Sequence, residues 1–452
     1  MTHISHPSAN LGRGWSPLLM LCGGGTGGHV YPALAVADAL RTITSLAVSP
    51  SATHWAEPGA NQPPNANVVS AFPPLDVANP APVSVSSNAV WPIINDPASA
   101  AKPRLLYVGS VGGMEGALVV RESDLPFVAL PAAAMRGRNP LAMAKNALVL
   151  ARGVVAARRL IRQERPAAIL GTGGYVCVPL FVAAALEKIP TLLYLPDIVP
   201  GWAGRVLARL ATRIAVTFDD SKRYLPADKV IVTGYPVRTA VFGQDKAACR
   251  RAFGLGDERP VVLVYGGSRG ARSINRAIAA LLPHLVQWAD IIHVCGREGD
   301  EIWLRAARAQ LEPELAARYH LFPYLHADDA RSMAVAFGAA DLAVCRAGAS
   351  TMAELPAAGI GAILIPLTAV KQEFNADALA GRGAAISIAD DAMLGTGEPT
   401  AGPLWRELHR LLTDSSARQT LAARSASLAQ PDAGARLASE WLSLARGGRF
   451  DG

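Results

Sequence analysis

Short apolar runs recur along the chain, separated by longer segments rich in Ala and Leu. Each run is continuously hydrophobic rather than alternating, a pattern typical of parallel strands that are covered on both faces. A first series of runs is followed, after a break, by a second. The runs lie at residues 16–22, 104–109, 126–131, 167–174, 191–197, 213–218 and 229–234, and then at 260–267, 291–296, 319–325, 341–346 and 361–367.

The segments between several of these runs have the composition of helices, the longest at residues 140–164. Strands that alternate with helices predict βαβ units and parallel sheets. Two such series predict an α/β fold of two Rossmann-like domains, whose parallel sheets face each other across a cleft. We expect domains at residues 1–238 and 239–430, with the link at 233–243, and a helix in 431–452 that packs back on the N-terminal domain.

One stretch, residues 42–103, does not fit this alternation. Between residues 42 and 101 it contains ten prolines and neither Lys nor Arg, and such a segment does not form a buried strand. We predict a Pro-rich insertion on the surface, between the first helix and the second strand. A loop of this length is either functional or disordered, and the composition favours disorder.

Composition narrows the class of protein. The chain has 452 residues, of which 51% are hydrophobic and 17% charged, which suits two folded domains and excludes a disordered chain. The formal net charge of +7 favours an anionic partner, such as a nucleotide, a nucleic acid or an acidic membrane surface. A basic surface without a function is the alternative. Five scattered cysteines without metal-binding spacing are typical of free thiols in a reducing compartment.

The apolar runs are too short for a membrane span of about 18 residues, and the first of them is too short for a secretory signal. We therefore expect a cytoplasmic protein. The helix predicted at residues 140–164 combines apolar positions with Arg and Lys. This combination suits an anionic membrane surface, and it suits an ordinary packed helix equally well.

Four glycine-rich loops follow predicted strands, at residues 23–28, 171–179, 266–275 and 345–359. Glycine allows the backbone to approach a ligand closely, and the free N–H groups of a helix start bind anions. Ligands of open α/β sheets bind at the carboxyl ends of the strands, where all four loops lie. The loops lack the Lys-Ser/Thr of a P-loop and the register of a dinucleotide fingerprint, so an NAD-dependent oxidoreductase is a weak alternative.

These loops carry a resemblance that is specific in its combination and order. The stretches GGGTGGHVYPALAVA, GTGGYV, TGYPVR, GGSRGARSIN, CRAGASTMAEL and KQEFNA resemble the successive motifs of the MurG family, N-acetylglucosaminyltransferases of bacterial cell-wall synthesis. The resemblance extends from about residue 16 to the C-terminus, apart from the Pro-rich insertion. It implies a GT-B type glycosyltransferase, with a nucleotide sugar on the C-terminal domain and a lipid-linked acceptor on the N-terminal domain.

The reaction implied by the resemblance is the inverting transfer of N-acetylglucosamine from UDP-N-acetylglucosamine to the muramoyl 4-hydroxyl of undecaprenyl-diphospho-muramoyl-pentapeptide. This step converts lipid I to lipid II in peptidoglycan synthesis. The implied partners are these two substrates and an anionic membrane surface, with no nucleic acid, at the cytoplasmic face of the cell membrane. No cofactor or metal is expected, because no DxD motif is placed to hold Mg²⁺ on a diphosphate; helix N-termini and Arg would stabilise the leaving group instead.

The resemblance also implies a set of donor-binding residues. Ser268 would donate to the diphosphate from a helix start, and Arg238 would contact the nucleotide through its permanent charge, unless it forms an interdomain ion pair. Glu354 would accept hydrogen bonds from the ribose hydroxyls. Gln372 would bind the sugar hydroxyls, and the backbone of Leu325 would meet uracil. The loop and helix start before Glu354 complete the set, with Ala349, Ser350, Thr351, Met352 and Ala353; helix capping is the alternative role.

In the N-terminal domain, Thr26, Gly27 and Gly28 are expected between donor and acceptor. His29 lies at the helix start, where the helix dipole lowers the imidazole pKa and favours the neutral form that a base requires. It would accept the proton of the attacking hydroxyl, unless it only caps the helix. Glu115 matches an acidic position of the family and would act with His29 by orienting the acceptor.

One segment departs from the family pattern. Where the family usually reads HEQN, this chain has YLPD, so that Leu195 replaces a glutamate and Asp197 replaces an asparagine of the donor site. Asp cannot donate as Asn does, and its charge is unfavourable beside a diphosphate unless it is paired. Two alternatives therefore stay open: a related UDP-sugar transferase acting on another glycolipid acceptor, and a non-catalytic nucleotide-sugar-binding protein. Asn375, three residues after Gln372, is expected to be structural.

Overall fold

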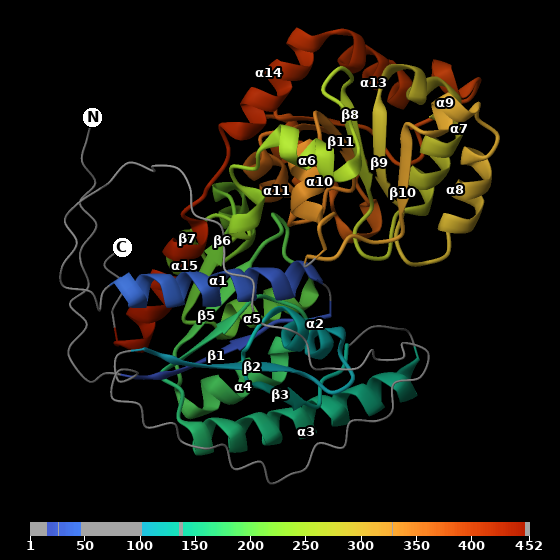
Figure 1. Cartoon of the computed structure of the whole chain (residues 1–452). Helices are drawn as coiled ribbons and strands as arrows, with labels where there is room; N and C mark the ends of the chain where they lie inside the picture. The colour runs from blue at the N-terminus through green and yellow to red at the C-terminus, as the bar shows by residue number, and fades with distance from the viewer. Residues whose placement is uncertain (1–15, 26, 47–101, 135–138, 328, 448–452) are drawn as a thin grey trace, which may run out of the picture.

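A computed structural model describes residues 16–25, 27–46, 102–134, 139–327 and 329–447. The N-terminal domain is built on a parallel sheet of seven strands, in the order β3-β2-β1-β4-β5-β6-β7 (Figure 1). These strands span Leu18–Cys22 (β1), Arg104–Ser110 (β2), Phe127–Leu130 (β3), Ala168–Gly171 (β4), Thr191–Leu195 (β5), Arg213–Val216 (β6) and Val230–Val232 (β7). They match the continuous apolar runs because helices cover both faces of the sheet.

The C-terminal domain repeats this arrangement with six parallel strands, in the order β10-β9-β8-β11-β12-β13. They span Val261–Tyr265 (β8), Asp290–Val294 (β9), Tyr319–Phe322 (β10), Leu342–Cys345 (β11), Gly361–Leu364 (β12) and Ala385–Ser387 (β13). The hydrophobic pattern predicts the first five. It misses the edge strand β13, which has three residues and buries only Ala385 fully.

Helices fill the connections between the strands. Those of the N-terminal domain are α1 (Gly27–Leu46), α2 (Met114–Glu122), α3 (Pro140–Glu164), α4 (Cys177–Glu187) and α5 (Trp202–Leu210). Those of the C-terminal domain are α6 (Lys246–Phe253), α7 (Arg272–Trp288), α8 (Glu301–Arg308), α9 (Pro313–Ala316), α10 (Met333–Ala339), α11 (Thr351–Ala358), α12 (Glu373–Ala380), α13 (Pro403–Thr413) and α14 (Ser415–Ala426). Short 3-10 helices lie at Asp219–Tyr224, Ala227–Lys229, Thr239–Val241, Thr368–Val370 and Pro399–Ala401.

The expected insertion begins later than predicted. Helix α1 runs to Leu46, so residues 42–46 are helical, and residues 47–101 lie outside the described residues.

The last helix, α15 (Ala433–Ala445), returns to the N-terminal domain. It packs against α1 and against strands β4 and β5, and lies beside α1 in Figure 1. Trp441 of α15 is fully buried in a cluster with Leu19 and Val30. The chain therefore crosses between the domains twice, once after β7 and once before α15.

Both sheets place their first strand at the same point of the topology. Strand β1 lies between β2 and β4, and β8 lies between β9 and β11. The connections diverge to opposite sides at this point, and the carboxyl edge there is where ligands of open α/β sheets bind. In the N-terminal domain this edge carries the loops after β1 and β4. In the C-terminal domain it carries the loops after β8 and β11.

The two domains meet at these carboxyl edges. Ile198 and Val199, which follow β5, are buried in a cluster with residues of the C-terminal domain. Ala349, in the loop after β11, packs in turn against the main cluster of the N-terminal domain. An ion pair of 2.6 Å between Arg382 and Asp220 also joins the domains. The glycine-rich loops of both sheets are thus gathered at one boundary.

Candidate active site

The loop after β1 is supported by a buried carboxylate. Glu115, in the first turn of α2, is fully buried. It accepts hydrogen bonds from the Ser110 backbone N–H (2.8 Å), the Ser110 hydroxyl (2.5 Å) and the Gly25 N–H (3.3 Å). A Cβ at Gly24 would lie 2.6 Å from this carboxyl group, so only glycine fits there. One oxygen of Glu115 thus accepts from the loop after β1, and the other accepts from Ser110 at the end of β2. The expected role of Glu115 in orienting an acceptor stays a prediction.

His29 lies between the two glycine-rich loops of the N-terminal domain. A Cβ built at Gly173 would lie 3.0 Å from its ring, and one at Gly174 would lie 3.6 Å from its Nδ1. Burial lowers the pKa of His29, while the charge of Asp197 and a backbone hydrogen bond with Gly24 oppose that decrease. The imidazole is therefore neutral at physiological pH, as a proton acceptor must be.

The neighbouring backbone is tied to the strands around it. The Thr172 hydroxyl, after β4, donates to the carbonyl of His29 at 2.5 Å, and the Tyr235 hydroxyl, after β7, donates to the carbonyl of Gly28 at 3.5 Å. Gly27 is the first residue of α1. The remaining residue expected here, Thr26, lies outside the described residues.

Asp197 follows β5 at the domain boundary. Its Oδ1 accepts a hydrogen bond of 2.9 Å from the side-chain amide of Asn375 on α12. The charge that replaces the family's asparagine is thus paired with the C-terminal domain. Leu195, the other departure, is the last residue of β5 and is buried in the core of the N-terminal domain.

The loop after β8 presents an open face. Gly267, Ser268 and Arg269 are exposed, and Arg269 forms an ion pair of 2.5 Å with Glu298. A Cβ at Gly267 would meet nothing within 4 Å, whereas one at Gly270 would lie 2.0 Å from the backbone of the next loop. Ser268 thus stands on the open side, a few residues before the N-terminus of α7, and a hydroxyl close to a helix start suits an anionic ligand.

A buried polar network supports this loop from behind. His293 contacts the Tyr319 hydroxyl through Nδ1 (2.7 Å) and the Asn275 side chain through Nε2 (2.9 Å). The Asn275 amide donates to the Cys295 carbonyl and the Asp300 carboxylate, both at 2.9 Å. Burial lowers the pKa of His293 to about 3, so the ring is neutral. The network fixes the loop after β9 against the loop after β8.

The loop after β11 and the start of α11 carry the largest group of expected donor residues. Thr351 and Met352 are buried, whereas Ala349, Ser350, Ala353 and Glu354 are partly exposed. Burial raises the pKa of Glu354, and the charge of Arg238 and a hydrogen bond with Ser350 act in the opposite direction. The structure thus brings Glu354 and Arg238 together from different domains.

The two other expected donor residues differ in accessibility. The side chain of Leu325 is buried in the core of the C-terminal domain, which leaves its backbone as the group able to meet a base. Gln372 precedes α12, and its side-chain oxygen accepts a hydrogen bond of 3.0 Å from the Leu367 N–H. This bond fixes the amide at the same edge of the sheet as the loop after β11.

Arg238 lies in the link and is held by the N-terminal domain. Its guanidinium stacks 4.5 Å from the centre of the Tyr31 ring and lies 3.7 Å from the Glu122 carboxylate. The Tyr31 hydroxyl donates to Glu122 at 3.1 Å. Sequence reasoning missed both partners. Tyr31 stands two residues after His29 in the quoted glycine motif and could have been found there, whereas Glu122 at a helix end carries no distinguishing signal.

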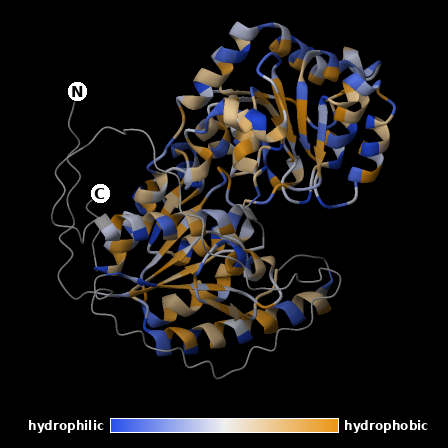
Figure 2. Cartoon of the chain, in the orientation of Figure 1, coloured by the Kyte–Doolittle hydropathy of each residue, from blue (hydrophilic) through white to orange (hydrophobic). Residues whose placement is uncertain are grey.

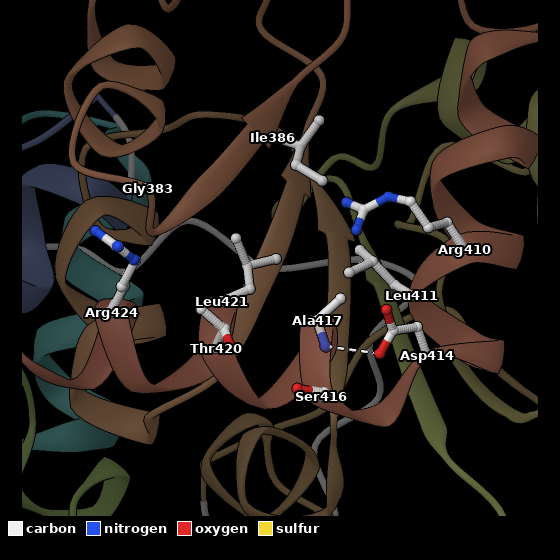
Figure 3. A pocket seen from close by; sticks show the side chains of 10 residues that line it. All are labelled: Gly383, Ile386, Arg410, Leu411, Asp414, Ser416, Ala417, Thr420, Leu421 and Arg424. Carbon is white, nitrogen blue, oxygen red and sulfur yellow. Dashed lines mark hydrogen bonds between the residues drawn. The ribbon is translucent and has the colours of Figure 1, made fainter.

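A cavity of about 370 Å³ lies elsewhere, between β13, α13 and α14 (Figure 3). Apolar side chains, including Ile386 and Leu421, lie between the guanidinium groups of Arg410 and Arg424. The described residues that line it include none of those expected from the glycine-rich motifs. We therefore assign the candidate active site to the carboxyl edges of the two sheets.

Comparison with known proteins identifies the family to which the chain belongs. Residues 100–216 match the Glycosyltransferase family 28 N-terminal domain, and residues 261–434 match the Glycosyltransferase family 28 C-terminal domain. The UDP-N-acetylglucosamine–N-acetylmuramyl-(pentapeptide) pyrophosphoryl-undecaprenol N-acetylglucosamine transferase of Roseiflexus sp. (strain RS-1) is 50% identical, over 92% of this chain and 93% of the relative. The protein of the same name from Desulforudis audaxviator (strain MP104C) is 34% identical, over 89% and 94% of the two chains.

The fold has solved counterparts as well. The crystal structure of Acinetobacter baumannii MurG is similar with a TM-score of 0.61 and 24% identity, covering 94% of this chain and all of that one. At that identity the likeness concerns the two-domain fold. The identity to the Roseiflexus relative extends over nearly the whole of both chains, and both halves of glycosyltransferase family 28 are matched in order. The chain therefore belongs to the MurG family of glycosyltransferases.

Proposed function

We propose that this protein transfers N-acetylglucosamine from UDP-N-acetylglucosamine to the 4-hydroxyl of the muramoyl residue of undecaprenyl-diphospho-muramoyl-pentapeptide. The observation that carries the proposal is the 50% identity to the Roseiflexus transferase over 92% of this chain. The arrangement of the loops supports it, because one domain encloses a neutral imidazole and the other leaves a helix N-terminus open to an anion.

The donor binds to the C-terminal domain in this proposal. Its diphosphate lies on the open loop at Ser268, where backbone N–H groups and the N-terminus of α7 stabilise negative charge. Glu354 accepts hydrogen bonds from the ribose hydroxyls, and Gln372 contacts the sugar. Arg238, already beside Glu354, adds a guanidinium to the nucleotide site.

The chemical step is a single displacement at the anomeric carbon. The muramoyl 4-oxygen forms a bond to that carbon on the face opposite UDP, the bond to the UDP oxygen breaks, and the configuration is inverted. The hydroxyl proton passes to His29, whose neutral ring is prepared by burial. The negative charge that develops on UDP is stabilised by the helix N-terminus and Arg238.

The acceptor is lipid-linked, and we infer that helix α3 attaches the N-terminal domain to the membrane surface. Leu141 and Leu148 on α3 are 82% and 53% exposed, and Lys145 and Arg152 lie on the same helix. Figure 2 shows hydrophobic and hydrophilic residues interspersed along α3. Exposed apolar side chains between cations suit an anionic bilayer surface.

Within the described residues, no helix combines the length and hydropathy needed to cross a bilayer.

Flotation with liposomes tests the role of α3. The parent protein is expected to float with vesicles that contain phosphatidylglycerol and less with neutral vesicles. The double variant Leu141→Glu/Leu148→Glu is expected to stay at the bottom of the gradient. Equal flotation of both proteins contradicts this role of α3.

The activity itself is tested by UDP release in the presence of the lipid-linked muramoyl-pentapeptide. UDP-N-acetylglucosamine is compared with UDP-glucose and UDP-galactose as donor. Release that requires both the acceptor and the N-acetyl donor supports the proposal. UDP binding without release contradicts it, and favours a different glycolipid acceptor or a binding protein without turnover.

A further inference from the structure

Asp197 stands at the same edge of the N-terminal sheet as His29. Strands β1, β4 and β5 are neighbours in that order, His29 follows β1, and Asp197 follows β5. The ring of His29 lies against Gly173 and Gly174, which follow the strand between them. The carboxylate and the imidazole therefore stand at the same sheet edge, on either side of the loop after β4, and the charge of Asp197 opposes the decrease in the pKa of His29.

Asn375 fixes this carboxylate across the domain boundary. Its side-chain amide donates to Asp197 Oδ1 at 2.9 Å and to the Ala347 carbonyl, in the loop after β11, at 3.0 Å. Its side-chain oxygen accepts from the Ile198 N–H at 3.1 Å. Asn375 is 1% exposed, and both of its amide hydrogens and its oxygen are used. The buried side chain of Asn375 thus fixes the position of the loop after β5 relative to the donor side of the molecule.

The other titratable groups around this pair are two phenols, a thiol and the carboxyl group of Glu115. Tyr194 on β5 and Tyr235 after β7 are phenols whose pKa is raised by burial. The Cys22 thiol at the end of β1 likewise has a pKa raised by burial. Glu115 on α2 is turned to the backbone of the glycine-rich loop. Asp197 is the carboxylate whose charge acts on the imidazole.

We propose that Asp197 is a positioning residue for the transfer reaction: its negative charge acts on His29 from the same sheet edge, and Asn375 holds it in register with the donor side of the molecule. The inference rests on the proposed function, in which His29 accepts the proton of the acceptor hydroxyl. An asparagine at this position would still accept the hydrogen bond from Asn375. That asparagine would lack the negative charge of Asp197. In this chain, Asp197 therefore makes the same interdomain contact and also interacts electrostatically with His29.

Two variants separate the charge from the contact. Asp197→Asn removes the charge and keeps an oxygen for Asn375, whereas Asp197→Ala removes both. We expect Asp197→Asn to shift the acidic limb of the kcat–pH profile to lower pH and to lower kcat on the plateau several-fold. Its KM for UDP-N-acetylglucosamine is expected to stay within about twofold of the parent. Asp197→Ala and Asn375→Ala are expected to raise that KM in addition, because the register with the donor loop is lost.

A titration that does not depend on activity accompanies the kinetics. The His29 imidazole is followed by NMR in full-length protein with labelled histidine, and a His29→Gln variant assigns the signal. The expected result is a lower His29 pKa in Asp197→Asn than in the parent. An unchanged His29 pKa, or superimposable pH profiles of parent and Asp197→Asn, overturns the inference.

The pH profile and the NMR titration together show which part of the inference is wrong. If the His29 pKa decreases and the pH profile does not move, the role of Asp197 in the reaction is overturned together with His29 as the base. If no variant or parent turns over the muramoyl acceptor, the proposed function fails, and the NMR titration still decides whether Asp197 acts on His29.

Discussion

The two domains use the same topology to build unlike loops. In each sheet the first strand lies beside the point where the connections diverge, and a glycine-rich loop leads from it into a helix. After β1 this loop is held by the side chain of Glu115, and the ring of His29 lies against the glycines after β4. After β8 the loop is exposed at Ser268 and is held from behind by the buried polar network around His293.

The two loops differ in the groups that they present to a ligand. The first loop leads into a side chain that can exchange a proton; Gly24 leaves room for Glu115, and Gly173 and Gly174 of the loop after β4 leave room for the ring of His29. The second loop retains no such side chain on its open face and offers backbone N–H groups at a helix start, which suit a charged but unreactive diphosphate. In the proposed function, the same fold thus provides a base in one domain and an anion site in the other.

The largest difference between the two loops is expected at His29. We expect His29→Ala to lower kcat by about 10²–10⁴-fold, the usual contribution of a general base, with little change in the donor KM. Steady-state UDP release with saturating acceptor measures both constants. Ser268→Ala is the matched variant in the other loop and is expected to act mainly on the donor KM. Near-normal turnover by His29→Ala would indicate that His29 is not the base and only contributes to the start of α1.

Two glycines of the second loop form a matched pair. Gly267 and Gly270 have φ of 85° and 88°, so alanine is strained by about 1–2 kcal/mol at either position. Only at Gly270 would the new Cβ also overlap the Cys295 carbonyl. Gly270→Ala is expected to lower the free energy of unfolding by about 3 kcal/mol or more and to raise the donor KM. Gly267→Ala should lose only the backbone contribution; equal losses in denaturant titrations would contradict this view of the loop.

The polar network around His293 predicts a pH dependence of stability. His293 has a pKa of about 3 in the folded protein and an ordinary value near 6.5 when unfolded. Between these values the unfolded state binds the additional proton, so the contribution to stability is complete above about pH 6.5 and decreases as the pH falls towards 3. Denaturation midpoints at pH 7.5 and 5 should differ, by on the order of 1–2 kcal/mol for this group.

A control for this titration comes from the variants. His293→Gln should show a smaller difference between the two pH values than the parent does. The exposed His284→Gln should retain the difference seen in the parent. The prediction is wrong if His293→Gln and the parent respond equally to pH.

A further effect is expected at the carboxyl group that holds the first loop. Glu115→Gln replaces an acceptor of three hydrogen bonds by an amide that turns one N–H₂ group towards donors. A buried mismatch of this kind costs about 1–3 kcal/mol. We expect a lower melting temperature and a higher KM for the acceptor, with UDP binding unchanged.

Glu122→Gln, on the same helix, is the control for that change, because Glu122 has no contact with Ser110 or Gly25. It should leave the acceptor KM close to that of the parent. A defect in UDP binding in Glu115→Gln alone would indicate that the first loop contributes to the donor site.

Much of the architecture follows from hydrophobic continuity. Strands such as β1 and β8 are buried along their whole length, so their residues are apolar without interruption and are recognisable in isolation. Strand β13 escapes the same reasoning because an edge strand of three residues needs little apolar surface. The extent of α1 beyond residue 42 was also missed, because Thr and Ser in its last turns resemble the polar segment that follows.

Roles at the site were harder to predict than positions. The motifs lead to His29 and Ser268 because glycine-rich turns and helix starts are local features. The supporting role of Glu115 depends on residues 110 and 25, and the partners of Asp197 lie on α12 of the other domain. Such contacts are set by tertiary packing, which no short window of sequence contains.

The return of α15 has a consequence for the order in which the protein is completed. Trp441 and its neighbours on α15 fill the core of the N-terminal domain around Leu19 and Val30. A ribosome therefore releases the entire C-terminal domain before the N-terminal core can close. The domain that is synthesised first is finished last, and a truncation before α15 would leave the C-terminal domain with its sheet intact and expose the core of the N-terminal domain to chaperones and proteases.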